Sequence, residues 1–354
     1  MCNSTKVSKN RKIRKPENRV SLDTLVQLST ADDLGREKLI KRQKAKAITL
    51  GQLFPLIDLD SDMKKSYWRA YHCNRQILQC GYKMVSKYCN ARWCTVCNRI
   101  RMAKMINGYS PALLNLVDLQ FITLTRPNVK AHDLAEEYQI FIKSWRAIYK
   151  NLRKTYGVIP EGIRKVECTY NPITDSYNLH FHVLMEGRDN GNLLIDLWLK
   201  RNPTANRKGQ DIRPARDGSL IELFKYAVKG VHKGKFYPKA LDNIYRVLKG
   251  RRTYQPFGIK KYVDEDVSGI KSQEIRFKGY RTDFWTWDED KRDWMNSKGE
   301  LLTEYIIEGK LSDWIESLTD VDEAEGGQEP QLLIEFEEIK EVKSDSYNMS
   351  MYSG

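Results

Sequence analysis

The decapeptide Asn178–Gly187, "NLHFHVLMEG", places two histidines on either side of one large apolar residue in a chain with only five histidines. Its alternation of apolar and polar residues is typical of a β-strand, in which side chains at i and i+2 point to the same side. His180 and His182 are therefore expected to project together, and the other face would carry Phe181, Val183 and Met185. Two half-buried structural histidines would give the same pattern, so the decapeptide alone leaves both interpretations open.

The decapeptide ends a longer segment that predicts a β-hairpin. Two alternating runs between residues 162 and 186 flank the turn-forming stretch "NPITDS". With the turn centred between residues 173 and 174, Glu167 lies opposite His180, and facing residues have Cβ atoms about 5 Å apart. Two imidazoles and one carboxylate with open coordination positions suit Mg²⁺, Mn²⁺ or Zn²⁺. Glu167 would be an ordinary solvated strand residue if the register slipped by one residue.

The flanking sequence predicts the elements around this hairpin. "LQFITLTRP" (119–127) indicates a strand that a proline ends. A long amphipathic helix follows, with the apolar stripe Leu134, Tyr138, Phe141, Trp145, Ile148 and Leu152. After the hairpin, we expect a helix over 191–201, a strand over 209–217 and a helix over 219–230. The order β-α-β-β-α-β-α predicts an α+β fold with a central antiparallel sheet flanked by helices.

The last of these helices, "SLIELFKYAVKG", carries reactive side chains. Ser219 is suited to its N-cap, Glu222 would complete a capping box, and Gly230 would end it. In this helix Glu222, Tyr226 and Lys229 share one face. A phenol beside an ammonium group and a metal-bound phosphate can lose its proton and attack phosphorus, and a nearby carboxylate can accept a proton. An ordinary amphipathic helix with a packed tyrosine and solvated charges is the alternative.

A cysteine cluster precedes the first strand: Cys80-x8-Cys89-x4-Cys94-x2-Cys97. Four thiolates ending in C-x-x-C predict a closed, tetrahedral structural zinc site, with Cys73 and His72 as spare candidates if Cys80 is not a ligand. Buried free thiols are the alternative interpretation. The same segment carries three arginines that suit contact with DNA, namely Arg92, Arg99 and Arg101.

The charge distribution indicates a polyanionic partner. The 354-residue chain has a net charge of +14, although residues 313–345 contain twelve Asp/Glu and only two Lys, so the remainder carries +24. A region with this large positive charge attracts nucleic acid through counterion release. The basic N-terminus lacks an apolar secretory segment, and no apolar run is long enough to span a bilayer. We therefore expect a cytoplasmic protein that has reduced cysteines and no membrane partner.

The composition divides the chain into five expected regions. They are a basic flexible N-terminal arm (1–55), a small Cys-rich zinc-binding segment (56–110), the α+β domain (111–265), a basic and aromatic extension (266–318) and an acidic, disordered tail (319–354). A helix is expected within the arm around "REKLIKRQKAKAI". The stretch "KGRRTYQPFGIKKY" (249–262) suits phosphate contact and base stacking, with Arg251 and Arg252 as candidates beside Lys225 of the tyrosine helix. A solvated sheet edge with core aromatics is an equal alternative for that stretch.

The ordered combination of motifs resembles the HUH endonuclease superfamily. More narrowly, it resembles the rolling-circle replication initiator (Rep) proteins of small plasmids, in the group with one catalytic tyrosine and an upstream glutamate. The motifs are "FITLT" (121–125), "LHFHVL" (179–184) and "FKYAVK" (224–229), with a similar cysteine pattern upstream. The resemblance covers residues 70–260. Leu179 departs from it, because many relatives have proline there.

The resemblance implies an HUH-type antiparallel sheet and a set of roles for the site residues. The two histidines would hold Mg²⁺ or Mn²⁺, and Tyr226 would attack the scissile phosphate of single-stranded plasmid origin DNA. That attack leaves a 5′-phosphotyrosine link and a 3′-OH for host polymerase to extend, with a host helicase as a further partner. Lys229 would orient the phosphate or stabilise the phenolate, and Glu222 would activate water at termination. Glu167 as third metal ligand rests on the hairpin register more than on the family pattern.

Two other functions remain open at this point. One is an HUH transposase or relaxase, although a relaxase normally carries a helicase and no P-loop motif occurs in the sequence. The other is a zinc-dependent DNA- or RNA-binding regulator in which Tyr226 and the histidine pair are structural. The regulator would bind nucleic acid and leave every phosphodiester intact.

Overall fold

The expected hairpin forms the centre of the computed structural model, which describes residues 31–80, 83–224, 228–229, 231–232, 235–262 and 282–308. Strands β4 (Gly162–Asn171) and β5 (Ser176–Glu186) pair antiparallel around a four-residue turn. Asp175 in this turn has φ of +43°, a left-handed conformation that aspartate tolerates better than most residues. Glu167 pairs with His180, so the predicted register is confirmed.

Four further strands complete the large sheet, whose antiparallel order is β10-β4-β5-β3-β6. β3 (Leu119–Thr125) pairs with the other edge of β5, and β6 (Asp211–Pro214) pairs with β3. β10 (Tyr254–Phe257) pairs with the first four residues of β4. β7 (Val228–Lys229) pairs in parallel with the later residues Cys168 and Thr169 of β4. The predicted α+β class with a central antiparallel sheet is confirmed.

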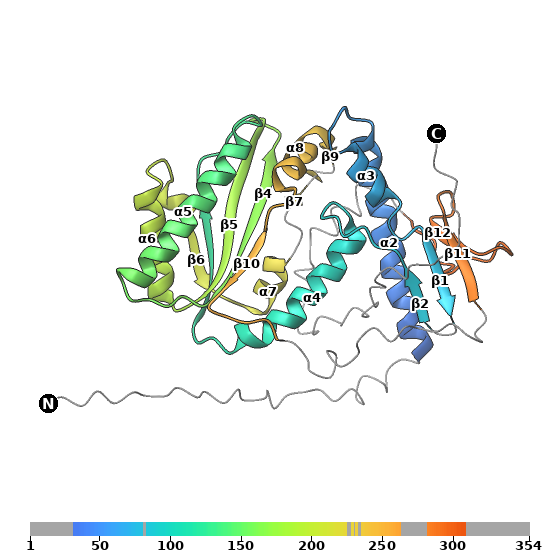
Figure 1. Ribbon diagram of the computed structural model, residues 1–354, viewed down its shortest axis with the longest axis horizontal. Helices are drawn as coiled ribbons and strands as arrows, with labels where there is room; N and C mark the ends of the chain where they lie inside the picture. The colour runs from blue at the N-terminus through green and yellow to red at the C-terminus, as the bar shows by residue number, and fades with distance from the viewer. Residues whose placement is uncertain are drawn as a thin grey trace, which may run out of the picture.

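Helices cover both faces of this sheet (Figure 1). Helices α5 (Leu134–Lys154) and α6 (Arg188–Arg201) pack on one face, where Phe141 and Trp198 meet the buried ring of Phe181 from β5. The other face meets the end of α4 (Thr95–Leu114) and α7 (Asp217–Phe224) through a smaller core of Leu113, Phe121, Ile163, Leu184, Leu223 and Phe224. Because side chains alternate along β5, His180 and His182 lie on the face that carries α7.

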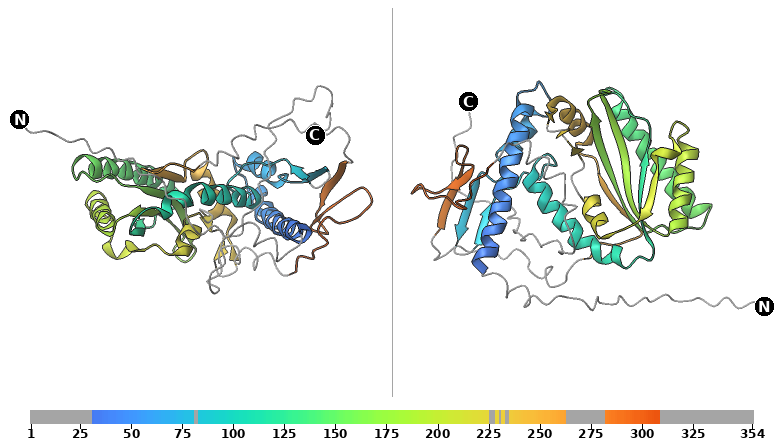
Figure 2. Two further views of the ribbon diagram at one scale, coloured as in Figure 1. Left: turned by 90° about the horizontal axis from the view of Figure 1, so that it is seen from below. Right: turned by 180° about the vertical axis from the view of Figure 1, so that it is seen from behind.

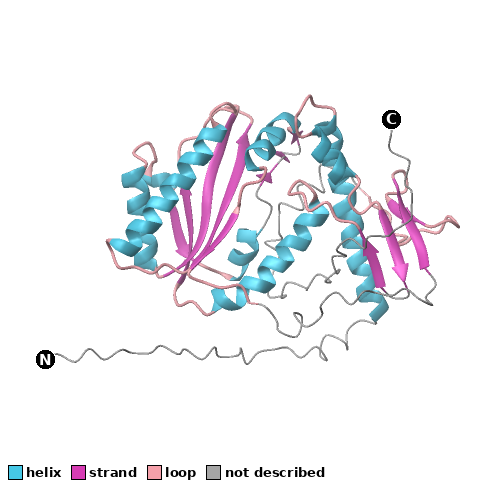
Figure 3. Cartoon of the chain, in the orientation of Figure 1, coloured by secondary structure: helices cyan, strands magenta, loops and turns pink. Residues whose placement is uncertain are grey.

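A second lobe is built from both ends of the described chain (Figure 2). It contains α2 (Ala31–Ile57), α3 (Lys64–Tyr71) and the small sheet β12-β11-β1-β2. The small sheet joins β1 (Gln76–Cys80) and β2 (Lys83–Ser86) to β11 (Thr282–Asp288) and β12 (Asp293–Met295). Figure 3 shows this sheet beyond α2, well separated from the large one.

Helix α8 (Pro238–Leu248) connects the two lobes. Ile244 and Leu248 belong to the core of the large sheet, whereas Leu241 and Tyr245 belong to the core around α2 and α3. The remaining short elements are the 3₁₀ turn η1 (Arg207–Gly209) and the hairpin of β8 (Val231–His232) and β9 (Lys235–Phe236). In the described part of the chain, no helix is both long and apolar enough to cross a bilayer.

The second lobe corrects three of the expected regions. The expected flexible arm contains α2, which is a helix because Ala45, Leu53 and Leu56 bury an apolar face against α3. The Cys-rich segment and the 266–318 extension are not separate, since β1 pairs with β11 over five residues. Helix α4 also runs beyond the expected boundary at residue 110. Residues 1–30 and the acidic tail lie outside the described residues.

The expected helix over 219–230 is also corrected. Helix α7 begins at Asp217 and ends at Phe224, so Ser219 is not its N-cap; the Ser219 hydroxyl accepts a hydrogen bond from the Arg216 backbone N–H. Residues 228–229 form β7 because β10 leaves the later half of β4 unpaired, and strand pairing there overrides local helix propensity. Lys229 therefore does not share a helix face with Glu222.

Candidate functional site

Two neighbouring strands bring the candidate metal ligands together. Glu167 of β4 pairs with His180 of β5, and the next row along the same face contains Lys165, His182 and Thr123. The Nε2 atom of His182 lies 3.5 Å from Oε2 of Glu167, and the two imidazole rings are 4.8 Å apart. One ligand atom from each of Glu167, His180 and His182 lies within 4.8 Å of the other two. The sequence thus identified all three members.

The two imidazoles have defined orientations. Nδ1 of His182 lies 3.3 Å from the Thr123 hydroxyl, and Nδ1 of His180 lies 3.4 Å from the carbonyl oxygen of Asn178. Hydrogen bonds at Nδ1 leave Nε2 as the ligand atom, an arrangement that outer partners of metal-binding histidines often impose. The donor set of two imidazoles and one carboxylate fits a divalent cation that keeps open positions for substrate.

The electrostatics of this cluster favour metal-binding protonation states. Burial raises the pKa of Glu167, but the Lys165 ammonium, followed by the two neighbouring imidazoles, outweighs burial and lowers the pKa to about 2. Burial, together with His180, lowers the pKa of His182 to about 3. At neutral pH the site therefore offers an ionised carboxylate and a neutral imidazole.

Two residues of this site were missed in the sequence. Lys165 is completely buried, and its Nζ lies 2.7 Å from Oε2 of Glu167 and 3.4 Å from the backbone oxygen of Glu222 in α7. Tyr254 of β10 pairs with Lys165 and donates a hydrogen bond from its hydroxyl to the backbone oxygen of Phe224. Strand alternation was the available signal for Lys165, because it stands two residues before Glu167.

The candidate catalytic residues are only partly described. Glu222 is in α7 with its carboxylate 2.8 Å from Arg213 of β6, a half-exposed ion pair. Lys229 is in β7, beside Thr169 of β4. Tyr226 and Lys225 lie outside the described residues, between Phe224 and Val228. Both flanking residues are placed: Phe224 packs under the histidine face, and Val228 pairs with Cys168, next to Glu167.

The second candidate metal site is the cysteine cluster, and one of its members differs from the prediction. The four gathered sulfurs belong to Cys73, Cys89, Cys94 and Cys97. Sγ of Cys97 lies 3.5 Å from Sγ of Cys73 and 3.6 Å from Sγ of Cys89. A zinc ion with bonds of about 2.3 Å places tetrahedral sulfurs about 3.8 Å apart, so the spacing fits zinc. Cys80 instead belongs to β1, paired through its backbone with Lys83 and Thr282.

Helix α2 supports the cysteine cluster with buried charge. Lys46 is 1% exposed and donates hydrogen bonds from Nζ to the backbone oxygens of Cys73, at 2.7 Å, and Tyr71. Burial lowers its pKa to about 8 despite the opposing effect of the nearby cysteines. Thr49 of the same helix accepts a hydrogen bond from the backbone N–H of Thr95, at the start of α4. The cluster therefore joins α2, α3 and α4.

The arginines proposed for DNA contact occupy different environments. Arg92 donates to the backbone oxygen of Leu248 at the end of α8, and Arg101 donates to that of Asn90 in the cysteine loop. The guanidinium of Arg251 lies 4.4 Å from the Tyr138 ring centroid, on the sheet face opposite the histidines. Arg99 is half-buried in α4 and Arg252 is exposed.

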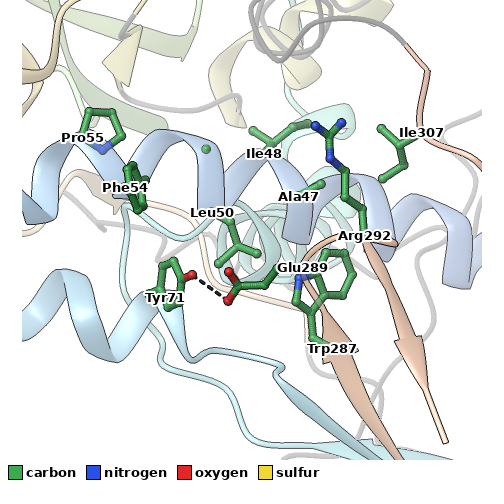
Figure 4. Close-up of a pocket in the computed structure, with 11 residues that line it drawn as sticks. Ala47, Ile48, Leu50, Phe54, Pro55, Tyr71, Trp287, Glu289, Arg292 and Ile307 are labelled. Carbon is green, nitrogen blue, oxygen red and sulfur yellow. Dashed lines mark hydrogen bonds between the residues drawn. The ribbon is translucent and has the colours of Figure 1, made fainter. Parts of the chain in front are cut away.

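A pocket in the second lobe is separate from both clusters. It has a volume of about 320 Å³ and lies between α2 and the small sheet (Figure 4). Ile48, Phe54 and Trp287 contribute apolar lining, and Tyr71 donates a hydrogen bond of 2.7 Å to Glu289 at its edge. No ligand of either candidate metal site lines this pocket.

Comparison with known proteins assigns the fold and these sites to a class. The family model described as "Replication protein" matches residues 83–188. Protein rep of Staphylococcus aureus is 37% identical over 162 residues, which cover 40% of this chain and 69% of that protein. No solved structure matches the chain. The matched region contains the hairpin, both histidines, Glu167 and three of the four clustered cysteines.

The chain therefore belongs to the family of replication proteins. Within this family it is a rolling-circle plasmid replication initiator, a Rep protein. The family implies that it binds plasmid origin DNA.

Proposed function

We propose that this Rep protein is a metal-dependent nicking and joining endonuclease that uses Tyr226 as its single nucleophile. The observation that carries the proposal is the convergence of Glu167, His180 and His182 beside the end of α7. Consecutive Cα atoms are 3.8 Å apart, so residue 226 has its Cα within about 8 Å of Val228, which pairs with β4 next to Glu167. The described residues on either side of the tyrosine, Phe224 and Val228, therefore both lie at the large sheet.

The histidine cluster is proposed to hold Mg²⁺ or Mn²⁺ through Glu167 and the two Nε2 atoms. When bound, the cation would polarise the scissile phosphate and neutralise charge that develops on its oxygens. The protein's own contribution is to present these three ligand atoms in fixed orientations, through Thr123, Asn178 and Lys165. That arrangement leaves the side of the ligands that faces α7 for single-stranded DNA.

The proposed strand transfer starts with the loss of the Tyr226 phenolic proton. The phenolate oxygen then bonds to phosphorus, the bond from phosphorus to O3′ breaks, and O3′ takes up a proton to give the 3′-OH primer. Lys229 would stabilise the phenolate or orient the phosphate. Glu222 would accept a proton from water at termination, so that hydroxide cleaves the regenerated origin without a second tyrosine. Arg213 holds the Glu222 carboxylate in its present position.

The cysteine cluster is proposed to hold a structural zinc ion. Four protein sulfurs leave no open position for substrate, so this site would stabilise the second lobe and take no part in the chemistry. Arg92, Arg99, Arg101, Lys225, Arg251 and Arg252 remain candidates for contacts to origin DNA. The 3′-OH would be extended by host polymerase, and a host helicase would open the duplex.

The test is the covalent adduct. Wild-type protein and Tyr226→Phe are incubated with Mn²⁺ and labelled single-stranded fragments that cover the encoding replicon, and products are separated on denaturing gels. The exposed Tyr156, at the end of α5, provides the matched control Tyr156→Phe. We expect a DNA-linked band from the wild type and Tyr156→Phe only, with the nucleotide on Tyr226 by mass spectrometry. Absence of an adduct from all three proteins would favour the zinc-dependent regulator.

A further inference from the structure

The C-terminal end of α7 is held on the large sheet by two neighbouring side chains. In α7 the Glu222 carbonyl accepts a hydrogen bond from the Lys165 ammonium at 3.4 Å, and the Phe224 carbonyl accepts one from the Tyr254 hydroxyl at 3.2 Å. Lys165 and Tyr254 are a cross-strand pair of β4 and β10, so both donors stand side by side.

The pair also packs closely against its surroundings. Lys165 has no exposed side-chain surface, and an ammonium group is kept in such a place only where polar partners replace water. The Tyr254 ring lies 5.8 Å from that of Phe224. Phe224 is therefore held both by this ring contact and by the hydrogen bond from the Tyr254 hydroxyl. These contacts hold the last described turn of α7 on the large sheet.

Lys165 joins this helix end to the histidine cluster. Its ammonium lies 2.7 Å from the carboxylate oxygen of Glu167 that faces His182. One cation therefore bonds to both a metal-ligand carboxylate and the backbone of the helix that precedes Tyr226. The Lys165 side chain is fixed at one end by the backbone of β4 and at the other by its ammonium group. It therefore sets the distance between Glu167 and the end of α7.

We propose that Lys165 and Tyr254 are positioning residues that fix the end of α7, and with it the start of the segment carrying Tyr226, relative to Glu167. The inference rests on the proposed nicking function and adds two residues to it. Both side chains act through the backbone that leads to the nucleophile. Displacing a reacting group by about 1 Å lowers a rate by about a hundredfold, so loss of this support should slow the chemistry more than it weakens binding.

The experiment compares Tyr254→Phe, which removes only the hydroxyl, with Tyr138→Phe. Tyr138 is matched because its hydroxyl also donates to a backbone oxygen, that of Arg252, on the opposite face of the sheet. Single-turnover adduct formation is measured at saturating Mn²⁺ and oligonucleotide, together with oligonucleotide affinity. We expect Tyr254→Phe to form the adduct at least about tenfold more slowly, with affinity within about twofold of wild type, and Tyr138→Phe to match wild type.

A second variant tests the other half of the pair. Lys165→Met keeps the length of the side chain and removes the charge. Mn²⁺ affinity is measured by electron paramagnetic resonance. We expect slower adduct formation but Mn²⁺ binding at least as tight as in wild type, because a positive charge beside the cation has been removed. A purely structural role predicts the reverse, with weaker Mn²⁺ binding and lower thermal stability.

Hydrogen exchange separates failure of this inference from failure of the proposed function. Peptides covering residues 218–230 should exchange faster in Tyr254→Phe than in wild type, whether or not the protein nicks DNA. Wild-type adduct formation with unchanged exchange and unchanged rate in Tyr254→Phe would overturn the positioning role alone. Absence of a wild-type adduct overturns the proposed nicking function and, with it, the catalytic purpose of the positioning.

Discussion

The two metal-ligand clusters of this Rep protein are assembled in different ways. Glu167, His180 and His182 belong to one hairpin, whose strands are joined by a four-residue turn. The cysteine cluster takes Cys73 from the end of α3, Cys89 from the loop after β2, and its last two members from the start of α4. A hairpin fixes its contacts by register, whereas the cysteine cluster depends on how three segments pack. Local pattern therefore identifies the first site better than the second.

The largest expected effect concerns Cys73, which the sequence indicated only as a spare candidate for the zinc site. Purified wild-type protein should hold one zinc ion, and Cys73→Ser should lose it and unfold the second lobe, since binding a structural zinc stabilises a fold by about 10 kcal/mol or more. Cys80→Ser should keep the zinc. Zinc content is measured by atomic emission after reducing, chelator-free purification, and stability by thermal unfolding.

The reverse outcome would restore the original assignment. Zinc loss from Cys80→Ser with retention in Cys73→Ser would mean that Cys80 is a zinc ligand and that Cys73 is not. Absence of zinc from the purified wild-type protein would remove zinc from the account of this lobe.

A smaller effect is expected at the hairpin, because its strands hold together without a metal. His180→Gln should weaken Mn²⁺ binding by at least about tenfold, yet change thermal stability little and leave the zinc content unchanged. Titration with Mn²⁺, followed by electron paramagnetic resonance, measures the affinity. Asn178→Ala is a useful companion, since it keeps the backbone oxygen that His180 contacts. Equal Mn²⁺ affinity in wild type and His180→Gln would refute a role of this histidine as a ligand.

The smallest effect concerns acid stability without added Mn²⁺. The pKa of His182 is about 3 in the folded protein against 6.5 for the free side chain, so below pH 6.5 the unfolded chain binds a proton that the folded chain does not. Stability should therefore fall as pH drops from 6.5 towards 5, with a slope of at most about 1.4 kcal/mol per pH unit from this group. Urea unfolding of wild type and His182→Gln measures the difference in slope. An identical slope in both would contradict the buried, neutral imidazole.

Features set by short-range pattern were predictable from the sequence, whereas features set by the packing of distant segments were not. The register of Glu167 against His180 was predictable because alternation and turn chemistry act within 25 residues. The helix expected over 219–230 was wrong at Val228 and Lys229. These two residues form a strand on the part of β4 that β10 does not pair with, and the place where β10 pairs is set by the tertiary fold. Cys73 was only a spare candidate, because nothing in the spacing shows that α3 ends beside α4. Lys165 follows the same strand alternation as Glu167, two residues before it, and so was predictable as a neighbour of the histidine pair.

The pairing of β1 with β11 has a consequence for synthesis of the protein. Trp285 and Gln79 in this pair are 206 residues apart in the chain and are hydrogen-bonded through their side chains. Contacts of such separation form late, because a long loop must close first. The complete large sheet precedes residue 258, so it can fold on the ribosome while β1 still waits for its partner. A truncated product that ends before residue 282 would contain every residue proposed for catalysis but would leave an edge of β1 unpaired, a surface prone to aggregation. Assembly of the small sheet thus requires synthesis of the chain at least through β11.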